Sequence, residues 1–165
     1  MSRSVTLSFK KGGRKPNVLT ITRSDGSTTY VKFKPPLELH DLAHYAVEKI
    51  LDKPAGFYWL IDQGYIPSDF EKANNQRPPG LNKLIEEPDN LAVEYIVNQL
   101  MVETLNSGNS SDFIQILDGS MVEKGASKYT FDLTTDKVEN MRQLYFEVLQ
   151  KWRLTKDSDT LVLDL

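Results

Sequence analysis

The sequence predicts an α+β fold, in which a small antiparallel sheet packs against several helices on one face. Three β-rich runs come first in the chain, helical patterns fill its middle, and one alternating run closes it. Alternation of apolar and polar residues is typical of a half-buried strand, whereas apolar residues at three- and four-residue steps are typical of an amphipathic helix. We therefore expect a sheet that is built from the N-terminal strands and the C-terminal strand.

The first part of the chain predicts three strands, rich in Val, Ile, Thr and Tyr, at residues 5–9, 17–23 and 28–34. Asp25-Gly26 lies between the second and third runs, and this pair is favoured in tight hairpin turns. Two glycines and a proline within residues 10–16 predict a loop between the first and second strands.

The middle of the chain predicts three longer helices, at residues 37–52, 91–105 and 135–154. The first has an apolar stripe, whereas the second is apolar around most of its circumference and is expected to be central and buried. Asp89 or Asn90 is the candidate cap of the second helix, and Thr134 or Thr135 is that of the third.

Shorter segments have weaker patterns. We expect a short helical turn at residues 67–72, loops at 74–80 and 118–128, a short amphipathic piece at 112–117, and a strand or an extended approach at 129–132. Leu161, Leu163 and Leu165 alternate at the C-terminus, which predicts a final strand with these residues on one face.

The composition predicts a single cytoplasmic domain that covers residues 1–165. Hydrophobic residues make up 39% of the chain and charged residues 26%, a balance that is ordinary for a globular protein and unlike that of a disordered one. The absence of cysteine excludes a disulfide framework and a thiolate metal site. No secretion signal precedes the first strand pattern and no apolar run approaches the ~18 residues that span a bilayer, so we expect no membrane association.

The only two histidines, His40 and His44, lie four residues apart in the first predicted helix. At ~3.6 residues per turn, Glu48 follows one turn later on the same side. These three side chains form a candidate site for a divalent metal ion, with Glu94 of the second helix as a candidate carboxylate from outside. The simpler interpretation is that both imidazoles hydrogen-bond to neighbouring segments, while Asp41 points away from the core and is solvated.

The histidine pattern matches no complete catalytic motif. The metalloprotease helix has a glutamate directly after its first histidine, where this chain has Asp41. The His-Asp doublet resembles the HD-type metal-dependent phosphohydrolases, which need a further histidine upstream, and this chain has none. The His-Asp-x-x-His stretch also resembles a motif of a ubiquinone-biosynthesis family, which has a glutamate where this chain has Gly56. A metal-assisted enzyme therefore remains an alternative, and we expect no cofactor other than such a metal.

The segment after the first helix, residues 56–61, is rich in aromatic side chains that could line a pocket, a partner-binding patch or the core. Imidazoles and aromatics gather in this region, whereas no catalytic constellation is complete. The favoured hypothesis is therefore a non-enzymatic module that binds a protein or a small ligand. Its candidate binding residues are His40, Asp41, His44, Tyr45, Phe57 and Trp59.

Charge is unevenly distributed along the chain. The net charge is -3, but Lys and Arg predominate in residues 1–35. The basic N-terminal hairpin is thus a further candidate, for a contact with nucleic acid. Because nucleic-acid-binding domains are usually basic overall, we expect instead that this region neutralises the acidic helices packed against it.

Several short motifs, in the first helix and towards both ends, carry a resemblance. They are His40-Asp41-Leu42-x-His44-Tyr45-x-Val47-Glu48, Gly56-Phe57, Gly64, Asp69-Phe70, and Trp152-Arg153 followed by Thr160-Leu161-x-Leu163. In these motifs the chain resembles an uncharacterised family of small bacterial proteins. Residues 73–130 carry no such motif, and residues 156–159 stand where we expect a Pro-Gly turn. The family has no known activity, so the resemblance implies a bacterial, cytoplasmic origin and the fold boundaries but no function.

Overall fold

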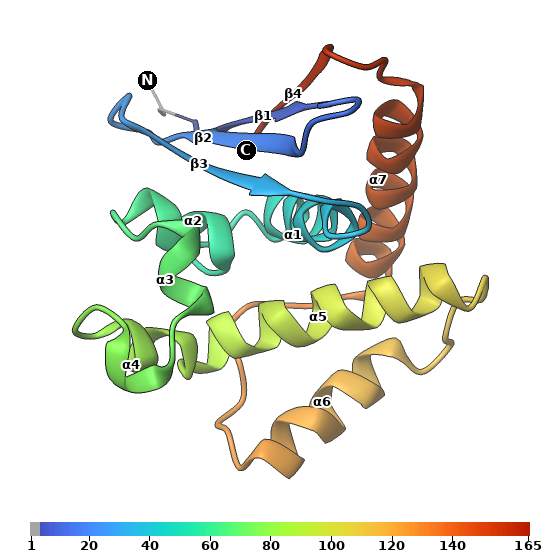
Figure 1. The fold of residues 1–165 in the computed structure, drawn as a ribbon. Helices are drawn as coiled ribbons and strands as arrows, with labels where there is room; N and C mark the ends of the chain where they lie inside the picture. The colour runs from blue at the N-terminus through green and yellow to red at the C-terminus, as the bar shows by residue number, and fades with distance from the viewer. Residues whose placement is uncertain (1–3) are drawn as a thin grey trace.

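In the computed structural model, which describes residues 4–165, a four-stranded antiparallel sheet lies over a group of helices (Figure 1). The strands are β1 (Thr6–Lys10), β2 (Asn17–Thr22), β3 (Thr28–Phe33) and β4 (Thr160–Asp164). The helices are α1 (Glu38–Leu51), α2 (Phe57–Asp62), α3 (Pro67–Glu71), the 3₁₀ helix η1 (Asn74–Gln76), α4 (Leu81–Ile85), α5 (Pro88–Leu105), α6 (Phe113–Lys124) and α7 (Thr135–Leu154). The predicted α+β fold is confirmed.

The sheet has the order β3-β2-β1-β4, so that the C-terminal strand pairs with β1. Leu163 lies opposite Leu7 in this pairing, and both are buried on the face that meets the helices. Val162, on the other face, is 55% exposed. The predicted closing strand and its inward-facing register are therefore confirmed.

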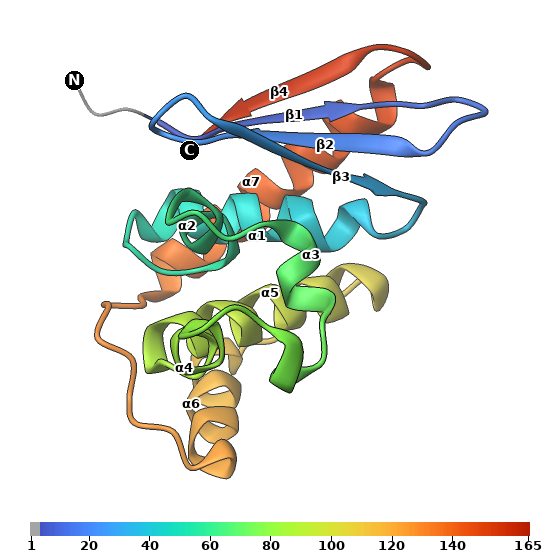
Figure 2. The same cartoon turned by 60° about the vertical axis from the view of Figure 1, so that its left-hand side comes forward.

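Helix α1 occupies the layer directly below the sheet, with α5 and α6 further from the sheet (Figure 2). It packs against both α5 and α7. The hydroxyl of Tyr145 on α7 donates to the carbonyl of Leu39 on α1 over 3.0 Å, which fixes the two helices to each other. Thr134 caps α7 as predicted, because its hydroxyl accepts from the amide of Lys137.

Two predictions in the middle of the chain are wrong, and the predicted loop at residues 74–80 is confirmed only for residues 77–80. Residues 118–124 continue α6 and are not a loop; Gly119 and polar neighbours weaken the helical pattern, but Phe113, Leu117 and Met121 form a buried stripe at four-residue steps. Helix α5 begins at Pro88, after Glu87, so neither Asp89 nor Asn90 is its cap. The predicted loop at residues 74–80 contains the turn η1.

The burial of α5 is confirmed only for part of the helix. Val93, Ile96 and Val97 are fully buried, whereas Val102 and Leu105 near the C-terminal end are 54% and 68% exposed.

Residues 129–132 are the extended approach and not a strand. The rings of Tyr129 and Phe131 are buried in the core, and they stack with their centroids 4.6 Å apart. Within residues 4–165, no helix combines the length and apolar character needed to cross a membrane.

Candidate functional site

A cavity of about 470 Å³ lies between the edge strand β3, helices α1 to α4 and the N-terminal half of α5. Most of its wall is apolar and is formed by Val31, Phe33, Leu37, Phe57, Leu60, Pro67, Phe70, Ile85 and Leu91. Its polar side contains four neighbouring groups from α1 and α5, namely His40, Asp41, His44 and Glu94. The cavity therefore combines an apolar wall with a concentrated polar region.

His44 is the most deeply buried polar residue of this region, with an exposed fraction of 2%. Its imidazole packs against the rings of Phe57 and Tyr58, at centroid distances of 5.5 and 6.3 Å. The Nδ1 atom lies 3.1 Å from Oε1 of Glu48, one turn further along α1. Because the carboxylate can only accept, Nδ1 is the donor of this hydrogen bond.

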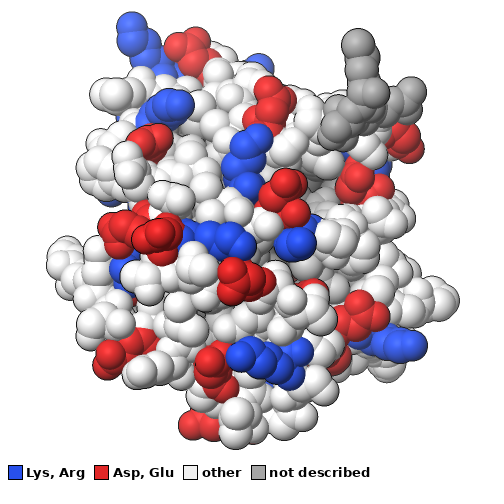
Figure 3. Space-filling model, turned by 180° about the vertical axis from the view of Figure 1, so that it is seen from behind, with Lys and Arg blue, Asp and Glu red and all other residues white. Residues whose placement is uncertain are grey.

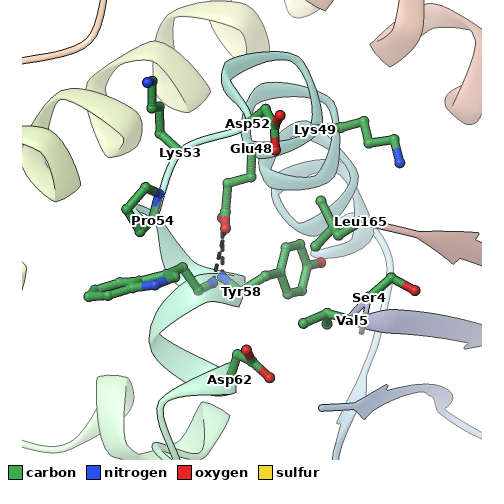
Figure 4. Close-up of a pocket in the computed structure, with 11 residues that line it drawn as sticks. Ser4, Val5, Glu48, Lys49, Asp52, Lys53, Pro54, Tyr58, Asp62 and Leu165 are labelled. Atoms are coloured by element: carbon green, nitrogen blue, oxygen red, sulfur yellow. Dashed lines mark hydrogen bonds between the residues drawn. The ribbon is translucent and has the colours of Figure 1, made fainter. Parts of the chain in front are cut away.

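Glu48 connects α1 to the first turn of α2. Its Oε1 accepts the backbone amide of Tyr58 and its Oε2 accepts that of Trp59, each over 3.1 Å (Figure 4). These amides have no partner within a helix at its N-terminus, so the carboxylate stabilises α2 while it orients His44. Glu48 was predicted as a metal ligand, but it lies behind the imidazole, on the side of Nδ1.

Glu94 reaches the two histidines from α5. Its Oε1 lies 3.1 Å from Nε2 of His40, and its Oε2 lies 3.2 Å from Nε2 of His44. The second contact is within ion-pair distance, but its direction does not meet hydrogen-bond geometry, and Nε2 of His44 has no hydrogen-bond partner among the described residues. One ring nitrogen from each of His40 and His44 and one carboxylate oxygen of Glu94 all lie within 4.8 Å of one another.

These contacts change the pKa values in opposite directions. Burial alone lowers the pKa of His44, but Glu48 and Glu94 outweigh this effect and raise it to about 10. Burial alone raises the pKa of Glu94, but its contacts with His40 and His44 hold it well below its usual range. Without a metal ion, an imidazolium thus lies between two carboxylates at neutral pH.

The prediction that Asp41 points into solvent is wrong. It is partly buried and lines the cavity, because α2 and α3 fold over this side of α1. Its carboxylate makes no hydrogen bond to the described part of the chain. Burial raises the pKa of Asp41 to about 6, although His44 and His40 act to lower it.

The structure brings together four of the six predicted binding residues. His40, Asp41, His44 and Phe57 line the same cavity. Tyr45 is buried in the core, 7% exposed, and does not line this cavity. Trp59 lines a second, more polar cavity of about 590 Å³, which Glu48 also lines.

Sequence reasoning missed the side chains that complete the wall. Val31 and Phe33 come from the edge strand, and Ile85 comes from a helix that was not predicted. Asn90, considered as a cap, instead accepts the amide of Gly56 over 2.7 Å and donates to the carbonyl of Leu84 over 2.8 Å. No local pattern marks these residues, because each serves the site through contacts with distant segments.

No family model, curated protein or solved structure matches this chain. The resemblance drawn from the motifs of α1 and the C-terminus thus stays a prediction. The chemistry of the cavity is the basis for a functional proposal.

The basic N-terminal hairpin uses part of its charge within the fold. Nζ of Lys11 donates to the carbonyls of Trp152 and Thr155 over 2.7 Å each, and it lies 4.9 Å from the centre of the Trp152 ring. Lys11 thereby satisfies carbonyls at the C-terminus of α7. On the face shown in Figure 3, basic and acidic side chains are interspersed.

Proposed function

We propose that the protein is a binding module for a small molecule that has an apolar body and a hydrogen-bond-donating end, such as an amine. The observation that carries this proposal is the cavity of about 470 Å³ beside His40 and His44. Its size is within the ~300–1,000 Å³ typical of small-molecule sites, which also combine apolar walls with few polar groups. A protein partner would be expected to use a flatter surface.

The polar groups of the cavity favour a donor over an anion. The Asp41 carboxylate lines the cavity without a hydrogen bond to the described protein atoms. Arg77 also lines it, but its guanidinium donates to the carbonyls of Phe70 and Lys72 and to the side chain of Asn82. Arg77 is thus committed to the fold, and Lys32, the other Lys or Arg of the lining, is exposed. The Asp41 carboxylate remains as an acceptor for a ligand.

The test is a binding screen by NMR on the isotope-labelled protein, after treatment with a chelator. The compounds are matched series of small aryl and alkyl amines, alcohols and carboxylates. Amines should bind most tightly and shift the resonances of cavity residues. Asp41→Asn should weaken amine binding by roughly 10- to 100-fold, the usual value of a hydrogen bond to a charged group.

Glu123→Gln is the matched control, because Glu123 is an exposed carboxylate on α6 that does not line the cavity. This variant should bind amines as the wild type does. The proposal is wrong if no compound perturbs the cavity, or if Asp41→Asn binds amines with unchanged affinity.

A further inference from the structure

We propose that His40, His44 and Glu94 bind one divalent transition-metal ion, zinc or ferrous iron, on the polar side of the cavity. Glu48 would be the outer carboxylate that orients His44. This inference concerns the same cavity as the proposed function. The metal site and the binding of amines are tested separately, and either can be wrong without the other.

The distances between the three groups fit a common ion. With metal–ligand bonds of ~2.0–2.1 Å in a tetrahedral site, neighbouring ligand atoms lie roughly 3.3 Å apart. Oε1 of Glu94 lies 3.1 Å from Nε2 of His40, and its Oε2 lies 3.2 Å from Nε2 of His44. One ligand atom from each of the three residues lies within 4.8 Å of the other two. The two imidazole rings meet edge to face, with centroids 4.6 Å apart. Side-chain adjustments that bring one Glu94 oxygen and a nitrogen of each histidine to that separation would surround an ion.

The second observation is the Nε2 atom of His44. The residue is buried, 2% exposed, and this atom has no directed hydrogen bond within residues 4–165. Nδ1 is already held by Glu48, so Nε2 is the atom that the ring presents to His40 and Glu94. A buried nitrogen without a directed hydrogen bond, beside a second imidazole and a carboxylate, is a suitable ligand for a metal ion that would replace the proton on His44.

Glu48 has the position of an outer-sphere partner. A metal-binding histidine commonly donates its other ring N–H to a carboxylate, which fixes the orientation of the ring. Both oxygens of Glu48 also accept backbone amides, from Tyr58 and Trp59, so this carboxylate is itself held in place. The site is thus supported from behind by α2.

The donor set indicates the class of metal. Two imidazoles and one carboxylate suit zinc and ferrous iron, whereas calcium and magnesium prefer sites made of oxygen ligands. Three protein ligands leave at least one coordination position free. Because all three residues line the cavity, that position would face a bound ligand or water. This arrangement suits a metal that polarises its ligand, as a metal-assisted enzyme requires.

The test begins with chelator-treated protein and uses cobalt(II) as a spectroscopic probe, with calorimetry of zinc binding beside it. The wild type should bind one equivalent and give the visible absorption of a low-coordinate cobalt site. His40→Gln and Glu94→Gln should each weaken binding by more than ~100-fold, and Glu48→Gln by ~10–100-fold, as for the loss of an outer-sphere partner. The side chains of His40 and Glu94 are 37% and 44% exposed, so these two variants should fold, which circular dichroism would check.

Glu71→Gln removes a carboxylate from the same cavity outside the cluster and should leave metal affinity unchanged. The inference is wrong if no cobalt spectrum develops, if Glu94→Gln retains full affinity, or if Glu71→Gln weakens binding equally. Amine binding to the metal-free protein is measured separately. Metal binding without amine binding would therefore overturn only the proposed function, and the reverse result would overturn only the metal site.

Discussion

Gly56 is the residue that lets α1 and α2 approach closely enough to build the site. Its φ of 110° lies in a region that side-chain-bearing residues rarely adopt. A Cβ atom at this position would clash with Cδ of Glu48, the carboxylate that holds both α2 and His44. The backbone conformation and the contact therefore both require glycine.

Gly56→Ala should lower the free energy of unfolding by roughly 2–4 kcal/mol, because it adds backbone strain and displaces Glu48. Gly119→Ala is the control, since Gly119 lies within α6 and the Cβ that it would gain meets nothing within 4 Å beyond the glycine's neighbours and the backbone of its own helix. That control should be neutral or stabilising by up to ~1 kcal/mol. Urea denaturation followed by circular dichroism measures both, and equal midpoints for the two variants would contradict this account of Gly56.

The candidate site was only partly predictable from individual residues. The spacing of His40 and His44 and the nearby aromatic residue Phe57 pointed to the correct region, because neighbours on one helix are fixed by its geometry. The orientation of Glu48 depends on the backbone of α2, and the contact between His40 and Glu94 joins residues 54 positions apart. Helical periodicity carries no information about either contact.

Strand β4 is the element that attaches the C-terminus to the sheet. It pairs along its length with β1. In the turn that connects it to α7, the amide of Ser158 donates to the carbonyl of Lys11 over 2.8 Å, and the amide of Lys11 donates to the carbonyl of Asp159 over 3.0 Å. Alternation places Leu163 against the core, 6% exposed, and Val162 on the outer face. The two positions differ in burial but belong to the same strand.

Leu163→Ala should cost roughly 2–4 kcal/mol in the free energy of unfolding, through lost burial and the space left behind. Val162→Ala should change it by less than about 1 kcal/mol, because that side chain is 55% exposed. Thermal and chemical denaturation of the pair is the measurement. If the outer-face variant were the more damaging one, the register of β4 would be wrong.

The prediction of whole elements failed where tertiary packing outweighs local pattern. Helix α6 extends to Lys124 although Gly119 lowers helix propensity, because its buried stripe packs against α5. The long helices α1 and α7, by contrast, each had an apolar stripe and recognisable ends. Strong periodicity is thus a reliable guide to an element, and short weak segments depend on their neighbours.

The charge distribution of the whole molecule argues against a surface for nucleic acid. The net charge is -3, and Lys11 of the basic hairpin is bonded to the end of α7. Affinity for nucleic acid requires several free Lys or Arg side chains, which neutralise phosphates and thereby release the counterions of the nucleic acid. Interspersed acidic groups, as on the face in Figure 3, oppose such binding.

Fluorescence anisotropy with labelled duplex DNA and single-stranded RNA should therefore show no saturable binding, even at low salt. The comparison is a variant in which Lys10, Arg14 and Lys15 are replaced by glutamine, which should behave like the wild type. Saturable binding that falls steeply with salt and is lost in this variant would contradict the prediction and restore the hairpin as a nucleic-acid contact.

The sequence by itself determined the α+β class, the sheet strands, the long helices and the region of α1 that carries both histidines. These features follow from periodicity, turn residues and spacing, which act between near neighbours in the chain. Only the tertiary structure decided that Glu94 meets His40 and His44, that Glu48 turns to α2, and that a cavity lies beside them. Those contacts join five or more separate elements, and the packing of the whole chain, not any local pattern, sets the distances between them.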